Sequence, residues 1–309
     1  RLLARHGTPE VRTKLVKRLA QEDNRDVLSE AIQNLGEEAR QTILIYLRDE
    51  SPQVRKVSVK ALSRLGGNES IPALRSLTDD SSPAVQCEAL AALCRLGQSA
   101  CRSELSDRLS DPRPEVRLAA AEALGSVEGG SASLLDIVRT DPVIDVRIAA
   151  VSSLGLGGDR RAVPVLVECL ADPFLRFYVI EAIGRLGAKE AAGPLLALLS
   201  RESNSLVRRL AIQALTGIGD PRTVERIAPL VAEPTLAPAV VEALCHLGGP
   251  HAEQALASLA LPDHPLCLEA VKGLTKIGTE RSVEPLLSLL GSVPDFLARF
   301  VVSALAAIG

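Results

Sequence analysis

The sequence repeats one pattern about every thirty residues, and no other feature constrains the fold as much. Most copies end in an apolar residue followed by glycine, a position that we call the anchor. After Gly7, the anchors lie at residues 36, 66, 97, 128, 158, 187, 219, 248, 278 and 309. Periods of 20 to 50 residues are typical of solenoids, in which each repeat buries its apolar face only against its neighbours.

Each copy contains two helical patterns. The second is the clearer: residues 116–125 and 146–155 align position by position, with apolar residues on one broad face. The first pattern often has proline in its first turn, where a missing N–H costs nothing, as at Pro72, Pro164, Pro194 and Pro285. Asp-Pro or Ser-Pro separates the two helices, and the anchor glycine ends the second by accepting the left-handed conformation.

The pattern combines a first helix such as Ala162 to Leu166, a turn such as Asp172-Pro173, and a second helix of the form Val-Arg-x-x-Ala-Ala-x-x-Leu-Gly, which residues 116–125 match. It resembles the short HEAT-like repeat of the phycobilin-lyase type, and the resemblance covers nearly the whole chain. Period and resemblance together predict an all-α fold, a right-handed α-solenoid (superhelix) of about ten stacked HEAT-like helix pairs. This repeat serves many unrelated proteins, so it does not fix a function.

We expect residues 1–309 to form a single solenoid. Residues 1–7 align with the last turns of a second helix, as a remnant of a preceding repeat, and the last copy ends at an anchor with apolar residues where a polar cap is needed. The sequence therefore predicts a segment of a longer protein, in which any catalytic activity could lie in the flanking regions.

The position eleven before the anchor carries arginine in most copies. Its residues, in order, are Arg25, Arg55, Gln86, Arg117, Arg147, Arg176, Arg208, Ala237, Cys267 and Ala298. With acidic residues near the preceding turn (Glu50, Asp111, Asp141 and Asp172), this series predicts an Asp/Arg ladder that bridges neighbouring repeats. The last three units lack the arginine, so we expect them to pack or curve differently.

The positions two, six and ten before the anchor are expected to face the concave surface. In the early repeats they hold Lys56, Lys60, Arg64 and Arg95. These cations are either a solvated face or a binding site for an acidic partner.

The sixth unit concentrates three of the six aromatic residues, Phe174, Phe177 and Tyr178, at the start of its second helix. Glu181 and Arg185 follow at the concave positions of the same helix. Aromatic residues beside arginine are typical binding anchors, although they can also fill a local packing gap. Phe296 and Phe300 repeat the arrangement in the last unit, where a further repeat would cover them.

No catalytic, metal or cofactor site is predicted. HEAT-like deoxyhypusine hydroxylases hold two irons through His-Glu pairs, and this sequence contains no His-Glu dipeptide. The four histidines, at 6, 246, 251 and 264, lack the paired spacing of a zinc site. A net charge of −3 and the absence of tryptophan argue against nucleic acid as the partner.

Six cysteines without a Cys-x-x-Cys pair favour a reducing, cytoplasmic location, and no apolar run is long enough for a membrane span. The leading hypothesis is a protein-protein interaction scaffold or adaptor that binds another protein along its concave surface. The resemblance implies an alternative: a phycobilin lyase or related chromophore-handling protein.

Overall fold

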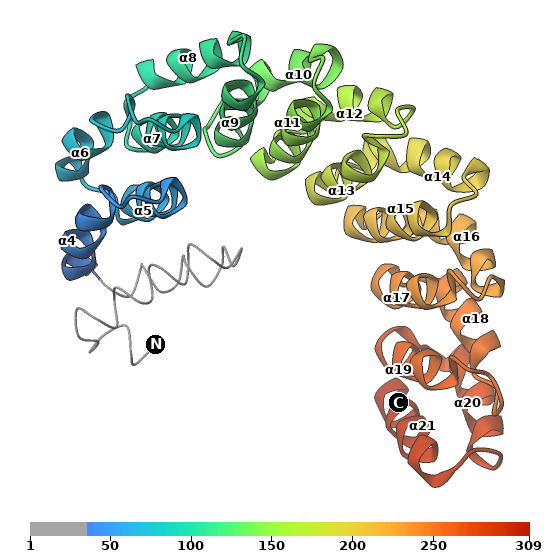
Figure 1. Cartoon of the computed structure of the whole chain (residues 1–309). Helices are drawn as coiled ribbons and strands as arrows, with labels where there is room; N and C mark the ends of the chain where they lie inside the picture. The colour runs from blue at the N-terminus through green and yellow to red at the C-terminus, as the bar shows by residue number, and fades with distance from the viewer. Residues whose placement is uncertain (1–35) are drawn as a thin grey trace. The chain divides into compact units, whose positions relative to one another are not determined.

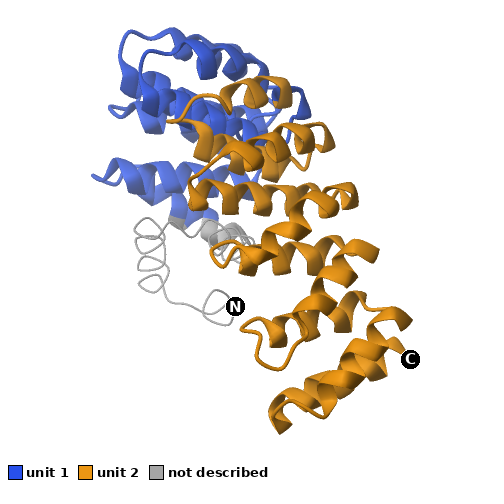
Figure 2. Ribbon diagram, turned by 90° about the vertical axis from the view of Figure 1, so that its right-hand side faces the viewer, with its two compact units in different colours: residues 1–162 blue, residues 163–309 orange. Residues whose placement is uncertain are grey.

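The computed structural model describes residues 36–309. These residues form α-helices and short 3-10 helices and contain no β-strand. The chain divides into two compact units, residues 1–162 and 163–309, which Figure 2 colours separately. Predictions on residues 1–35, including Arg25 and most of the unit that ends near residue 36, lie outside the described part.

In unit 1 the helices alternate between two layers (Figure 1). The first helices of the repeats are α4 (Gly36–Tyr46), α6 (Ile71–Arg75), α8 (Ala100–Asp107) and α10 (Ser131–Thr140). The second helices, which pack side by side, are α5 (Pro52–Leu65), α7 (Pro83–Arg95), α9 (Pro114–Leu124) and α11 (Ile144–Gly157). Three short 3-10 helices belong to the first-helix layer: η1 (Asn68–Ser70), η2 (Arg108–Ser110) and η3 (Arg160–Ala162).

Unit 2 has the same two layers (Figure 1). Its first helices are α12 (Val163–Cys169), α14 (Ala192–Arg201), α16 (Val224–Ile227), α18 (Pro250–Leu259) and α20 (Val283–Leu290). Its second helices are α13 (Arg176–Leu186), α15 (Ser205–Ile218), α17 (Ala237–Leu247), α19 (Cys267–Ile277) and α21 (Asp295–Ile308). The 3-10 helices of this unit are η4 (Lys189–Ala191), η5 (Pro221–Thr223), η6 (Ala228–Ala232) and η7 (Glu280–Ser282).

The core of each unit is built from the same positions of successive repeats. The residue four before the anchor is at most 1% exposed in eight successive repeats: Leu62, Leu93, Leu124, Leu154, Ile183, Leu215, Leu244 and Leu274. Each of these side chains lies on the face where a second helix meets its own first helix and its neighbours. Both units are therefore α-solenoids, as the sequence predicts.

Each anchor glycine from Gly66 onwards lies at the end of a second helix, and all of them except Gly278 have a positive φ. Gly187 and Gly219 have φ of 59° and 68°, the left-handed conformation that ends a helix and that glycine adopts without cost. The prediction is wrong at Gly278, where φ is −63°. There a Cβ atom would lie 2.9 Å from Ile308 Cδ1 and still closer to the Leu274 carbonyl oxygen, so the glycine is required by packing.

The arginine ladder is present, but its carboxylates belong to the following repeat and not to the preceding turn. Four of the arginines reach the acidic residue of the following repeat, in the pairs Arg55–Asp80, Arg117–Asp141, Arg176–Glu202 and Arg208–Glu233. From the preceding turn three of the arginines take carbonyl oxygens instead; Arg117 Nη1, for example, donates to Asp111 O at 3.0 Å. Each of these three arginines thus joins two turns of neighbouring repeats.

The repeats without the arginine are held by other contacts. Ala237 and Cys267, which replace it, are 5% and 3% exposed. Glu253 on α18 is 4% exposed and accepts hydrogen bonds from Thr279 N at 2.7 Å and Ser282 Oγ at 2.6 Å in the next repeat. The expected difference in the packing of these repeats therefore takes the form of small apolar contacts and a buried carboxylate.

Candidate functional site

The predicted aromatic anchor lies on the surface of unit 2. Phe174 is 76% exposed, Phe177 38% and Tyr178 36%. Phe177 and Tyr178 touch edge to face, with ring centroids 5.7 Å apart and an interplanar angle of 70°. They lie in the first turn of α13, which follows Leu175; that residue is fully buried and holds the start of the helix against the core. All three rings keep part of their surface in contact with solvent.

The neighbouring repeat extends this apolar surface. Leu206, in the first turn of α15, is 45% exposed and occupies the position thirteen before its anchor, as Phe174 does in the repeat before. Helices α13 and α15 approach closely: a Cβ on Gly184 would lie 3.1 Å from Ala214 Cβ. We call the four residues Phe174, Phe177, Tyr178 and Leu206 the aromatic patch.

Glu181 and Arg185 flank the patch on α13. Arg185 Nη2 donates to Glu181 Oε1 at 2.7 Å, and both side chains are nearly half exposed. An exposed pair of this kind contributes little to stability. Both groups stay accessible and form a polar border beside the rings.

The four predicted cations lie on α5 and α7 of unit 1, and Lys56, Lys60 and Arg95 contact carboxylates of their own unit. Lys56 Nζ lies 2.8 Å from Glu122 Oε2. Glu88, which is 3% exposed, receives Arg95 at 3.0 Å and Lys60 at 3.4 Å. The fourth cation, Arg64, is exposed at the end of α5. Their role towards an acidic partner stays a prediction.

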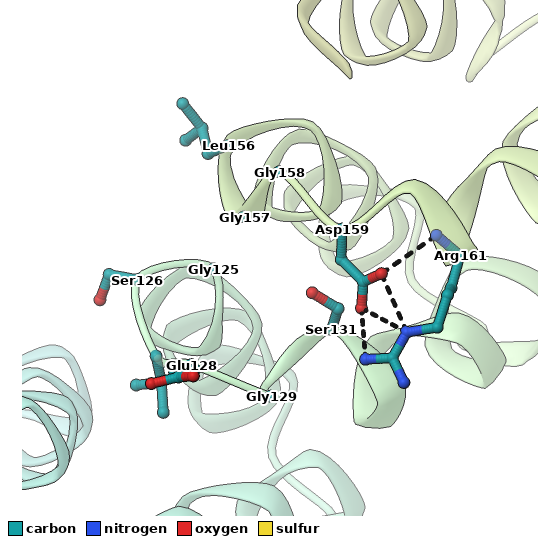
Figure 3. Close-up of a pocket in the computed structure, with 11 residues that line it drawn as sticks. Gly125, Ser126, Glu128, Gly129, Ser131, Leu156, Gly157, Gly158, Asp159 and Arg161 are labelled. Carbon is teal, nitrogen blue, oxygen red and sulfur yellow. Dashed lines mark hydrogen bonds and ion pairs between the residues drawn. The ribbon is translucent and has the colours of Figure 1, made fainter. Parts of the chain in front are cut away.

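A pocket of about 520 Å³ opens in unit 1 beside the ends of α9 and α11 (Figure 3). Four glycines line it: Gly125, Gly129, Gly157 and Gly158. Asp159 and Arg161 bond to each other there, with Oδ2 and Nη2 2.8 Å apart. No cysteine or histidine lines this pocket, so its walls lack a strong nucleophile or a base that titrates near neutral pH.

Burial raises the pKa of five cysteine thiols, those of Cys87, Cys94, Cys101, Cys245 and Cys267, which is the opposite of what activates a nucleophile. Burial raises the pKa of Cys87 and of Cys94 to about 11, so both thiols are protonated at neutral pH. Between residues 36 and 309 no group of three or more His, Cys, Asp or Glu side chains is arranged to hold a metal ion. His251 lies 3.6 Å from Glu225 at the surface, outside any such group.

The helices of the described range are short. None of them is both long and apolar enough to cross a membrane.

The same repeats are recognised by comparison with protein families. Four overlapping matches to the model of HEAT repeats cover residues 13–82, 76–155, 131–216 and 170–238. The chain belongs to the HEAT-repeat proteins. No curated protein matches it in sequence.

Several solved structures resemble this HEAT-repeat protein. The Escherichia coli protein YibA has 18% identity and a TM-score of 0.52, with 82% of this chain and 97% of YibA covered. Kap95p, solved with RanGDP, has 14% identity and a TM-score of 0.51, with 98% of this chain and 51% of Kap95p covered. The CpcE–CpcF phycocyanin lyase complex from Nostoc has 21% identity and a TM-score of 0.43, with 67% and 94% covered. At these identities the first two likenesses show the HEAT-repeat fold alone.

The sequence analysis missed one residue of the aromatic patch and the carboxylates that contact the cations of unit 1. Leu206 was detectable, because it shares the repeat position of the exposed Phe174. The carboxylates Glu88 and Glu122 stand at different repeat positions from the lysines that they contact. Only the folded HEAT repeats bring them together.

Proposed function

We propose that this HEAT-repeat protein is an interaction scaffold or adaptor that holds a partner protein along its second-helix faces. The aromatic patch of unit 2 is the main anchor in this proposal. Its support is one observation: three of the six aromatic rings of the chain are exposed within five residues, Phe174 in the turn before α13 and the other two in its first turn. Exposed aromatic side chains supply large contact areas at a low cost in side-chain entropy, and they are enriched among residues that dominate binding energy.

The charged pair beside the aromatic patch would make binding of the partner more specific. Glu181 and Arg185 lie within one turn of each other and neutralise each other in the free protein. A partner that buries the rings would have to satisfy both charges, and this requirement selects against surfaces that are merely hydrophobic. Lys56, Lys60, Arg64 and Arg95 in unit 1 form a second contact region for the same or another partner.

The test uses the full chain as bait to capture partner proteins from a lysate of the cells that produce it, with quantification of the captured proteins. The double variant Phe177→Ala with Tyr178→Ala should lose its partner and keep the melting temperature within a few degrees, because both rings are partly solvated. Phe296→Ala is the matched control, since Phe296 is 60% exposed but lies on α21. A large fall in melting temperature with capture intact would assign the rings to packing and contradict the proposal.

The alternative function, chromophore handling, is tested separately. A bilin added to the purified chain should change its visible absorbance if the chain binds it, and an unchanged spectrum would leave the scaffold proposal. The scaffold proposal keeps three further predictions. The partner is a protein and not a nucleic acid or a membrane, the location is cytoplasmic, and residues 1–309 form a single continuous solenoid.

A further inference from the structure

A carboxylate on α9 reaches back past a whole repeat to a lysine on α5. Lys56 Nζ and Glu122 Oε2 are 2.8 Å apart although the two residues are separated by 66 positions in the chain. Helix α7 lies between α5 and α9 in the second-helix layer, in contact with both. The ion pair therefore connects repeats that are not neighbours.

The Lys56–Glu122 ion pair indicates how the stack of helices curves in unit 1. Neighbouring packed helices lie about 8–10 Å apart, so α5 and α9 in a straight stack would be separated by roughly 16–20 Å. The side chains of a lysine and a glutamate can meet across that distance only if the second-helix face is concave, because curvature brings α5 and α9 closer together on that face. The face is concave between α5 and α9, and the Lys56–Glu122 pair spans the hollow.

The two carboxylates of this surface differ in how firmly they are held. Glu88 is 3% exposed, and its oxygens contact Arg95 and Lys60. The side chain of Glu122 is 48% exposed and has Lys56 as its ion-pair partner. Exposed ion pairs contribute little net free energy. Glu88 is thus a fixed counter-ion, whereas Glu122 can be exchanged.

The surroundings favour an anionic replacement. At the positions two, six and ten before the anchor, α5 and α7 carry four cations and no carboxylate: Lys56, Lys60, Arg64 and Arg95. The side chain of Lys56 is only 17% exposed, so its ammonium group is held in place along the helix surface. Removal of Glu122 would leave this group without its counter-ion.

We propose that Lys56 is a binding site for a carboxylate side chain of an acidic polypeptide segment, and that Glu122 occupies this site in the free protein. The segment binds by displacing Glu122, which then faces solvent. A polypeptide is favoured over nucleic acid because the occupant of the site in the structure is itself a carboxylate.

This inference deepens the scaffold proposal by naming the chemistry of a partner, but it does not depend on the aromatic patch. An experiment can therefore contradict the Lys56 site without contradicting the aromatic patch, and the reverse is also true. The patch variant Phe177→Ala with Tyr178→Ala should leave binding at Lys56 unchanged, and variants of Lys56 or Glu122 should leave capture through the patch measurable.

The test titrates the full chain into a fluorescent ten-residue peptide of alternating Glu and Ser at low salt, with anisotropy as the readout. Glu122→Gln should bind about three- to tenfold more tightly than the wild type, because it removes the internal competitor and keeps the site open. Lys56→Gln should bind about fivefold more weakly. Asp107→Asn, which makes the same charge change on α8 in the other layer, should bind as the wild type does.

The double variant decides the mechanism. In the Lys56→Gln background, Glu122→Gln should no longer tighten binding. An equal gain in both backgrounds would assign the effect to long-range charge and overturn the proposal, as would equal affinities of Glu122→Gln and Asp107→Asn. A thymidine oligonucleotide of the same charge is the second probe. If it binds more tightly than the peptide with the same dependence on Glu122, the polypeptide assignment is wrong.

Discussion

Arg117 on α9 holds Asp141, which precedes α11, through two hydrogen bonds of 2.7 and 3.0 Å. The side chains of the pair are 11% and 2% exposed, so most of the contact is removed from water. Arg117→Ala would leave the Asp141 carboxylate buried beside the Val143 N–H without its guanidinium partner, and removal of one partner of a buried pair costs about 3 kcal/mol. We expect α9 and α11 to lose protection against hydrogen exchange together.

Arg161→Ala is the control for this prediction. Arg161 forms a pair of similar length with Asp159, but its side chain is 77% exposed. Its removal should leave exchange protection and the denaturation midpoint almost unchanged. Equal effects of the two substitutions would show that the ladder does not stabilise the stack of repeats.

The pKa of Asp220 supplies a prediction on acid stability in unit 2. Hydrogen bonds from the Arg222 side chain and from its backbone N–H lower this pKa to about 2. The pKa in the unfolded chain is about 3.9. The carboxylate therefore stabilises the fold fully above about pH 4, and this contribution is lost as the pH falls towards 2.

The measurement is a carbon NMR titration of the Asp220 carboxyl group. Arg222→Ala should raise the midpoint towards the ordinary value and flatten the dependence of unit 2 stability on pH between about 4 and 2. A wild-type midpoint near the ordinary value would contradict the structure of this turn.

The fold was predictable from the sequence because contacts in a solenoid are local. The residue four before each anchor is buried in repeat after repeat, so a periodic sequence is enough to identify the core. The identity of the ladder carboxylates was not predictable in the same way. An arginine can reach either turn, and the prediction took its carboxylates from the preceding turn only, while Glu202 and Glu233 lie in the following one.

The functional surfaces were predictable only in part. The cluster from Phe174 to Tyr178 stands out in a chain with six aromatic residues, but its exposure depends on which face of α13 meets the core. The contact between Lys56 and Glu122 depends on the curvature of the stack. Curvature accumulates from small rotations between repeats, and no pairwise pattern in the sequence encodes it.

The buried carboxylate of Glu253 should be essential to the C-terminal repeats. Burial opposes its ionisation, but hydrogen bonds from Ser282 and Thr279 outweigh that effect and lower its pKa. Glu253→Ala would leave the Thr279 N–H and the Ser282 hydroxyl without their acceptor, at a cost of about 2 kcal/mol. Chemical denaturation should show this loss, and Glu242→Ala, an exposed change on α17, should not. Similar midpoints for both variants would refute the role of Glu253.

A pair of glycine substitutions tests how closely the second helices must approach. A Cβ atom on Gly125 would lie 2.7 Å from Ser153 Cβ and 2.9 Å from Ser153 Cα, so α9 and α11 would have to move apart. We expect Gly125→Ala to destabilise unit 1 by about 1–3 kcal/mol, the usual cost of overpacking. A Cβ atom on Gly291 at the end of α20 would meet nothing within 4 Å, and φ there is −84°, so Gly291→Ala should be neutral or slightly stabilising. Thermal denaturation of the two variants distinguishes packing from helix propensity, because propensity alone would make both substitutions stabilising.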